Sequence, residues 1–311
     1  MSANAAWILR RRRKDPWRRP WFLTALTWSY VFWSIVPVVI AIAFSFNAGR
    51  SRTSWQGFSL RWWVGSRFDA ESLWYNPELR TAMLHSLRLA GSTMLIAVPL
   101  GVLFAIGMDR WRGRVSSAAG FTMLLSFIVP EIILAIALFL MFTFLLHGLV
   151  RLGTTAQVLG LSTLQIPYPY IVVRARLLTI GKDYEEVAMD LGSSPTQAIR
   201  RVLLPLLSPA IFAGGALVFA NTIDDFVTVR YLSGLASTEP LSVKVYNAAR
   251  GAPVPSVNAA VSVMLFASLG VAGFAYILYR LLSRAQQPAG PEAIGGLTST
   301  AGFSSRGGAN I

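Results

Sequence analysis

Six stretches of the chain are apolar over most of the length that a helix needs to cross a membrane. A crossing takes about 20 apolar residues, because the hydrocarbon layer is about 30 Å thick. The pattern predicts six transmembrane helices, at residues 28–46, 87–108, 121–146, 156–178, 209–229 and 258–282. The sequence therefore predicts an all-α integral membrane protein with a basic segment at 1–27, a membrane domain at 28–282 and a tail at 283–311.

The fourth predicted helix is the most polar of the six. It contains two glutamines, two prolines and two arginines, namely Gln157, Gln165, Pro167, Pro169, Arg174 and Arg176. Such residues are tolerated at membrane depth where neighbouring helices cover them. We therefore expect this helix to lie inside the bundle.

Composition agrees with a membrane protein and narrows its chemistry. Apolar residues make up 54% of the chain and charged residues 14%, whereas soluble domains have about 25% charged residues. The net charge is +14, but the basic residues cluster beside apolar runs without interleaved aromatics, which predicts no nucleic-acid partner. The chain has no cysteine, and we interpret the distant His85 and His147 as side chains at span edges. No catalytic or metal site is predicted.

The basic residues also predict orientation. Cytoplasmic segments retain an excess of Lys and Arg, and the run from Arg10 to Lys14 is the strongest such signal. We expect both termini to be cytoplasmic in the inner (plasma) membrane, with anionic lipids against the arginines. A signal peptide cleaved near Ala41–Ala43 is the alternative, but the apolar run continues through Phe46. The Gly/Ser-rich composition of residues 286–311 predicts a disordered tail.

The connection at 179–208, between the fourth and fifth predicted spans, is polar and carries helix signals. Asp183 with Glu186 three residues later has the form of a capping box, and Gly192 suits a left-handed helix end. These signals predict a short helix over residues 184–191.

A second helix signal follows directly. Ser194 is an N-cap candidate, Pro195 suits the first helical position, and Gln197 completes a capping box. The helix is expected to run toward Leu204, with Pro205 interrupting or bending it. Because the two short helices have few apolar residues to bury against each other, the loop needs a partner. An amphipathic loop resting on the inner leaflet is the alternative.

The spacing in this loop resembles a known motif. Glu186–Ala188, then Gly192, then nine residues to Val202, Leu204 and Pro205, is similar to the Glu-Ala-Ala loop of binding-protein-dependent ABC importer permeases. Valine replaces the first alanine and the isoleucine of that motif. The resemblance implies the six-span, MetI-like core of these permeases, with a cytoplasmic coupling loop.

Other segments resemble the polyamine-type permeases, specifically the C-type subunit of spermidine/putrescine importers. The matching segments are Phe127–Ile132, Asp224–Asp225, Pro240–Tyr246 and Val257–Ala259. The resemblance runs from the second predicted span to Leu282. It implies import of polyamines or a related small cationic solute.

The resemblance also implies partners. An ATP-binding subunit dimer would bind ATP and Mg and drive the coupling loop, and this chain would hold no cofactor, because Gly181–Lys182 lacks the following Ser or Thr of a phosphate-binding loop. A second, non-identical permease and an extracytoplasmic substrate-binding protein would complete the importer, the latter docking on 47–86 and 230–256. The residues implied to couple to the ATPase are Tyr184, Glu185, Glu186, Ala188, Asp190, Gly192 and Pro205.

Four residues in or beside the fifth span are candidates for the substrate pathway. They fall on one face of a continuous helix and are Asn221, Asp224, Asp225 and Thr228. A charged residue within a span costs at least about 2.5 kcal/mol, so it usually faces a cavity, a pathway or an opposite charge. The structural alternative is an ion pair with Arg230, or with Arg174 and Arg176.

Glu131 presents the same choice between the pathway and an ion pair, and Tyr168 and Tyr170 either stack on substrate or pack a kinked helix. The tryptophans are predicted interface anchors, namely Trp7, Trp17, Trp21, Trp28, Trp33, Trp62 and Trp63.

The sequence thus predicts a non-catalytic permease subunit of an ATP-driven importer. A permease for another small organic solute, or an ion-coupled secondary transporter that uses Asp224 and Asp225, is the alternative.

Overall fold

The computed structural model describes residues 21–51, 54–65, 71–111, 113–251 and 255–285. The predictions for the arginine-rich N-terminus, Trp7, Trp17 and the tail after Ala285 lie outside these residues. Within the described ranges the secondary structure is helical apart from one antiparallel bridge between Asn47 and Phe58. The all-α prediction is confirmed.

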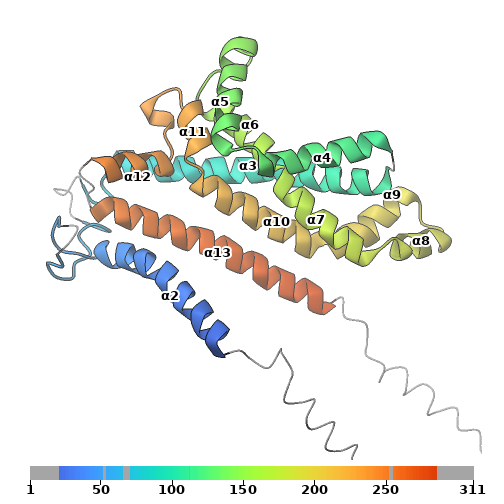
Figure 1. Ribbon diagram of the computed structural model, residues 1–311, viewed down its shortest axis with the longest axis horizontal. Helices are drawn as coiled ribbons and strands as arrows, with labels where there is room; N and C mark the ends of the chain where they lie inside the picture. The colour runs from blue at the N-terminus through green and yellow to red at the C-terminus, as the bar shows by residue number, and fades with distance from the viewer. Residues whose placement is uncertain (1–20, 52–53, 66–70, 112, 252–254, 286–311) are drawn as a thin grey trace, which may run out of the picture. The chain divides into compact units, whose positions relative to one another are not determined.

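The helices follow the chain in the order shown in Figure 1. The α-helices are α2 (Trp21–Phe44), α3 (Pro77–Arg110), α4 (Arg114–Ile128), α5 (Glu131–Leu140), α6 (Thr154–Gln165), α7 (Pro167–Ile180), α8 (Asp183–Asp190), α9 (Pro195–Ala198), α10 (Leu204–Asp224), α11 (Val227–Leu232), α12 (Leu241–Arg250) and α13 (Pro255–Ala285). Two π-helical turns, η1 (Met141–Leu145) and η2 (Ile199–Leu203), and one 3-10 turn, η3 (Ala236–Thr238), complete the set.

By length and composition, four of the described helical runs could cross a membrane. They are Trp21–Phe44, Pro77–Arg110, Pro195–Asp224 and Pro255–Leu281. The predicted third span is not one helix, since Ser116–Ile128 and Glu131–Leu145 are bent by 109° at a break. The break has a local cause, because Pro130 has no N–H to continue the helical ladder.

The predicted fourth span is also two helices, α6 and α7, and neither reaches the length and hydropathy of a crossing. Its predicted burial holds for Gln157, Gln165 and both prolines, whereas Arg174 is exposed. The prediction of six continuous transmembrane helices is therefore not confirmed: among the described residues, four helices are long and apolar enough to cross, or five if the bent pair crosses as one span.

The described residues fall into two compact units, one within 21–77 and 250–262, the other within 78–249 and 263–285. In the first unit, Trp62 is only 1% exposed, and its indole Nε1 donates to the Asn47 carbonyl at 2.6 Å. Trp63 is half-buried and stacks on Phe46, with ring centroids 5.1 Å apart. Trp62 thus lies in the core of this segment, which corrects its prediction as an interface anchor. Trp28 on α2 is exposed, as an anchor requires.

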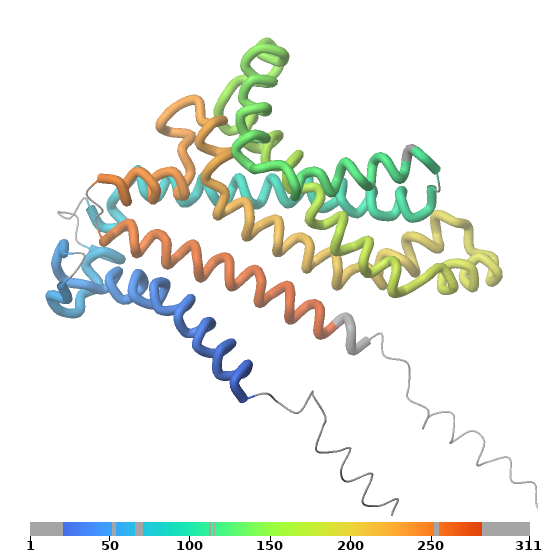
Figure 2. Tube along the Cα trace, in the orientation of Figure 1, coloured from blue at the N-terminus to red at the C-terminus, as the bar shows by residue number. Residues whose placement is uncertain are grey.

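In the second unit, α7 and α10 lie side by side (Figures 1 and 2). A Cβ on Gly214 of α10 would meet the Cα of Pro169 of α7 at 3.0 Å, so the two backbones approach closely where no side chain intervenes. Further along these helices, the buried side chains of Leu177, Leu203 and Leu207 pack with Val102 of α3. This core joins one end of α3, α7 and α10.

Candidate functional site

Two helix breaks line one cavity in the second unit. The first separates α4 from α5 at Val129–Pro130, and the second separates α10 from α11 at Asp225–Phe226. The cavity has a volume of about 550 Å³. Its lining consists of Ser126, Phe127, Ile128, Val129, Pro130, Glu131, Leu134, Leu164, Gln165, Tyr168, Asn221, Asp224, Asp225, Phe226 and Val227. Irregular backbone at membrane depth is tolerated where it lines such a cavity.

All the charged residues in this lining are acids. Glu131 comes from the start of α5, and Asp224 and Asp225 come from the end of α10. Asn221 and Gln165 add amide groups, and the Oε1 atom of Gln165 is buried with no hydrogen-bond partner among the described residues. The arrangement gives an electronegative cavity that favours a cation.

The two neighbouring aspartates have different roles. Asp224 is exposed, whereas the buried Asp225 accepts hydrogen bonds at Oδ1 from the backbone amides of Thr228 at 2.9 Å and Val229 at 3.3 Å. Asp225 therefore caps the first turn of α11. Its backbone carbonyl also accepts from the Ser242 hydroxyl at 2.8 Å, which ties the break to α12.

The prediction that the four pathway candidates share one continuous helix face is wrong, because α10 ends at Asp224 and Asp225 has an extended backbone. Asn221, Asp224 and Asp225 nevertheless meet at the cavity. Thr228 is fully buried in α11 and does not appear in the cavity lining. The four candidates thus come from α10, α11 and the connection between them, and not from one helix.

Two of the three arginines considered as partners for these aspartates bond elsewhere, and Arg176 makes no ion pair within the described residues. Arg230 pairs with Glu239 at 2.8 Å, and Arg174 donates to the Tyr170 hydroxyl. Across the described ranges, Glu131 and Asp224 make no ion pair. The structural alternative of a carboxylate–arginine pair at the cavity is therefore not observed.

Aromatic side chains form part of the cavity wall. Tyr168 meets Phe127 edge to face, with ring centroids 5.0 Å apart, and Phe226 stacks on Tyr246 at 4.2 Å. Tyr168 lines the cavity, whereas Tyr170 is buried in the core. Sequence reasoning missed Phe226 and Gln165 as lining residues. Gln165 had a usable signal, because it is a polar residue in an apolar run.

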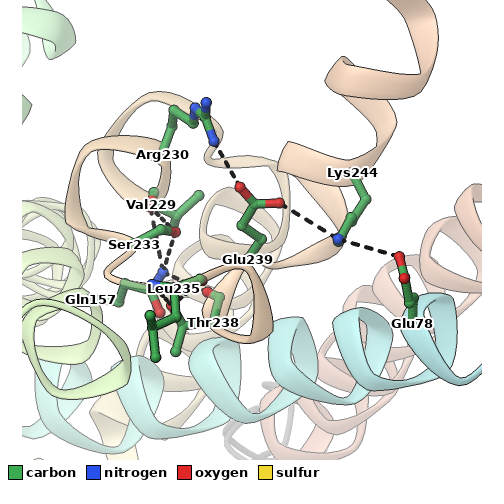
Figure 3. A network of polar contacts seen from close by, with 9 residues as sticks. All are labelled: Glu78, Gln157, Val229, Arg230, Ser233, Leu235, Thr238, Glu239 and Lys244. Carbon is green, nitrogen blue, oxygen red and sulfur yellow. Dashed lines mark hydrogen bonds and ion pairs between the residues drawn. The ribbon is translucent and has the colours of Figure 1, made fainter. Parts of the chain in front are cut away.

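A second polar cluster lies beyond α11, and we call Glu78, Arg230, Glu239 and Lys244 the Glu239 network (Figure 3). Glu239 accepts from Arg230 at 2.8 Å and lies 3.6 Å from the Lys244 Nζ atom. Lys244 also lies 3.6 Å from Glu78. These contacts tie α3, the end of α11 and α12 together.

Gln157 of α6 anchors the connection after α11 (Figure 3). Its Nε2 donates to Ser233 Oγ and to the Thr238 carbonyl, both at 2.9 Å. Because the amide nitrogen faces these acceptors, Oε1 accepts from Nε2 of His85 at 2.9 Å. His85 is buried, which corrects its interpretation as an interfacial side chain. His147 is exposed.

The connection at 179–208 folds as two short helices. α8 begins at Asp183, but Lys182 is the N-cap and makes no side-chain cap hydrogen bond, so the predicted Asp183 cap is wrong by one residue. α8 ends in a Schellman motif, in which the N–H of Ser193 bonds the Ala188 carbonyl at 3.0 Å and the N–H of Gly192 bonds the Met189 carbonyl at 2.9 Å. Gly192 has φ 89°, which confirms its predicted left-handed conformation.

The second helix also begins as predicted. Ser194 Oγ accepts from the Gln197 amide at 3.4 Å, and Gln197 Oε1 accepts from the Ser194 amide at 3.2 Å, which completes the capping box. Pro205 does not end the helix. The π-helical turn η2 precedes it and the chain continues as α10.

The side chains of α8 divide sharply between exposed and buried. Tyr184, Glu186 and Asp190 are exposed and Ala188 is half-buried. Glu185 is only 7% exposed and forms an ion pair with Arg110, at the end of α3. The exposed side presents Leu191 and Val187 beside the acids, a mixed surface without a partner among the described residues.

Comparisons with known proteins agree with this architecture. The family described as "Binding-protein-dependent transport system inner membrane component" matches residues 97–287. The chain is 30% identical over 249 residues to the spermidine/putrescine transport system permease protein PotC of Haemophilus influenzae, covering 80% of this chain and 91% of that one. It is 29% identical to the putrescine transport system permease protein PotI of Escherichia coli, covering 88% and 93%.

A solved structure has a similar fold. A chain of a bacterial ABC transporter involved in the import of the acidic polysaccharide alginate superimposes with a TM-score of 0.61 at 18% identity. The match covers 87% of this chain and 98% of that one. At this identity the likeness concerns the fold alone.

Proposed function

Because the chain belongs to the family of inner membrane components of binding-protein-dependent transport systems, we propose that it is the permease subunit of an ATP-driven importer for polyamines or a related small organic cation. The observation that carries the choice of solute is the cavity whose charged lining residues are all acids.

The cavity suits an elongated amine. An ammonium group forms charge-assisted hydrogen bonds with carboxylates, which are roughly twice as strong as bonds between neutral groups. Glu131 and Asp224, which make no ion pair in the described chain, are the carboxylates proposed to bind it. The orphaned Gln165 Oε1 offers a further acceptor, and Tyr168 offers a ring face to a cation. Asn221 would bind beside them, while Asp225 holds the break and Thr228 supplies its amide.

Energy would enter through α8. We assign Tyr184–Gly192 as the coupling helix, because its exposed acids and apolar residues have a mixed character that fits a protein partner. Glu186 and Asp190 would contact an ATPase dimer, which would bind ATP and Mg, while Gly192 and Pro205 shape the return to α10. The permease chain itself would hold no cofactor.

Further partners follow from the shape of the site. The cavity includes exposed Phe127, Ile128 and Pro130, so a second, non-identical permease would cover this side and complete the pathway. A substrate-binding protein would dock at residues 47–86 and 230–256. Lipids would cover α2, and both termini would be cytoplasmic.

The test is purification of the tagged chain from its native membrane, followed by reconstitution and uptake assays. We expect an ATPase subunit and a second permease to co-purify, and radiolabelled spermidine to accumulate only with ATP. Molybdate, an oxyanion, should not accumulate. A chain recovered alone, with uptake driven by an ion gradient, would replace this proposal with a secondary transporter. ATP-driven uptake of molybdate instead of spermidine would overturn only the solute.

A further inference from the structure

One acid on the proposed coupling helix faces inward. Glu185 and Glu186 are adjacent in α8, yet Glu186 is exposed and Glu185 is buried against Arg110. Sequence reasoning placed both in one set of residues that contact the ATPase. The structure separates them, since a buried carboxylate is poorly placed to bind a separate subunit.

The surroundings of Arg110 favour a close, directional contact. Its Nη1 lies 3.5 Å from Asp109 Oδ2, while Nη2 contacts Glu185, and the pair is largely buried. A buried ion pair stabilises a structure less than its attraction suggests, but removing one partner leaves a costly unpaired charge. The pair therefore makes the position of α8 sensitive to the position of α3.

A glycine with a left-handed backbone flanks α8 at each end. Gly181 precedes the helix with φ 72° and Gly192 follows it with φ 89°, and a Cβ at either position would meet no atom within 4 Å. Both are conformations that favour glycine, and both lie in open space. α8 also packs against α9 and against η2, which leads into α10, and the Arg110–Glu185 pair adds a contact with α3.

Arg110 lies at the end of a helix that is well embedded at that same end. Ala105 and Val102 of α3 pack in the core shared with Leu177 and Leu203, and Met108 packs against this core. A displacement of Arg110 would therefore move helices that are packed together, because this end of α3 is part of the core.

We propose that Arg110 and Glu185 are a positioning pair that couples α8 to α3, so that movement of α8 shifts the membrane helices directly as well as through the chain connection. The inference rests on the proposed function, in which an ATPase moves α8. It assigns Glu185 a role inside this subunit and leaves Glu186 for the partner.

The test uses the assembled complex and a reporter that does not require a known solute. Because the chain has no cysteine, Ser126→Cys introduces a single thiol in this subunit, at the cavity. The rate of its modification by a membrane-impermeant reagent is measured with and without ATP and vanadate. In the otherwise unchanged chain, trapping the nucleotide state should change this rate.

Four variants are then compared in the Ser126→Cys background. Arg110→Glu and Glu185→Arg should each reduce the nucleotide-dependent change in labelling by roughly tenfold, the scale of typical coupling between sites. The reversed pair, Arg110→Glu with Glu185→Arg, should restore most of it. Glu186→Arg is the matched control, and it should weaken association with the ATPase while the complexes that do form label normally.

The outcomes separate a coupling role from a merely structural one. Loss of assembled complex, with normal nucleotide-dependent labelling in the complexes that remain, would show that the pair only stabilises the fold and would overturn the inference. Normal labelling and normal assembly in both single variants would overturn it as well. If the unchanged chain binds no ATPase, the proposed function fails first and the coupling role falls with it.

Discussion

The acids at the cavity and the acids of the Glu239 network lie in the same unit but differ in their partners. Glu239 contacts two cations and Glu78 contacts one of them, so negative charge there is matched by Arg230 and Lys244. Glu131 and Asp224 have no such partner in the described chain. The Glu239 network joins helices to one another. The carboxylates of Glu131 and Asp224 are left available to a ligand.

Asp225 shares one property with each of these two groups of acids. It lines the cavity like Asp224, yet its Oδ1 is engaged by two backbone amides like the acids of a structural network. Membership in the cavity lining therefore does not by itself define a binding residue. The hydrogen bonds of each carboxylate distinguish binding residues from framework residues, and substitutions can test the distinction.

The largest expected effect comes from the double variant Glu131→Gln, Asp224→Asn. A hydrogen bond to a charged group contributes about 1.5–3 kcal/mol, so each loss should weaken the apparent affinity for spermidine about tenfold and the double loss roughly a hundredfold. ATP-driven uptake of labelled spermidine over a concentration series measures this. Unchanged uptake, with the complex intact, would show that the carboxylates of Glu131 and Asp224 do not bind the solute.

A smaller effect is expected at Asp225, where two substitutions separate charge from cap. Asp225→Ala removes the acceptor of two buried amides and should destabilise the subunit by about 1–3 kcal/mol, whereas Asp225→Asn keeps an acceptor and should preserve most of the stability. Thermal unfolding of the purified complex in detergent measures both. Equal destabilisation by Asn and Ala would show that the charge, and not the cap, holds the break.

The smallest effect is expected at the rim of the Glu239 network. Glu78 is largely exposed and lies 3.6 Å from Lys244, which keeps Glu239 as a second partner, so Glu78→Gln should change stability by less than about 1 kcal/mol. Spermidine uptake should stay within about twofold of the unchanged chain. A loss of uptake as large as that of the cavity variant would place the network in the transport pathway.

Local signals in the sequence predicted local structure well. The capping box at Ser194–Gln197 and the left-handed Gly192 involve residues within a few positions of each other, so their spacing predicts their geometry. The resemblance to the permease family was likewise visible in short motifs, and the match over residues 97–287 confirms the family. The cavity residues Asn221, Asp224 and Asp225 could be selected because charges and amides are rare in apolar runs.

Long-range pairings could not be predicted in this way. Gln157 bonds His85 and the Thr238 carbonyl, and Glu185 pairs with Arg110. Many polar residues could have met these partners, and only packing of the helices decides between them. The span boundaries failed for a related reason, since an apolar run shows length but does not reveal a 109° bend at Pro130.

The paired helix breaks have one further consequence, for the hydration of the cargo. The last backbone hydrogen bond of α4 runs from the N–H of Val129 to the Leu125 carbonyl, and that of α10 runs from the N–H of Asp225 to the Asn221 carbonyl. The carbonyls after Leu125 and Asn221 at these helix ends have no partner within their own helix. Such groups retain water unless a ligand replaces it. A cation of the proposed kind would exchange part of its water for the carboxylate and amide groups that line the cavity and so avoid the full cost of dehydration. Selection among amines would then depend on the spacing between their charges more than on how readily they shed water.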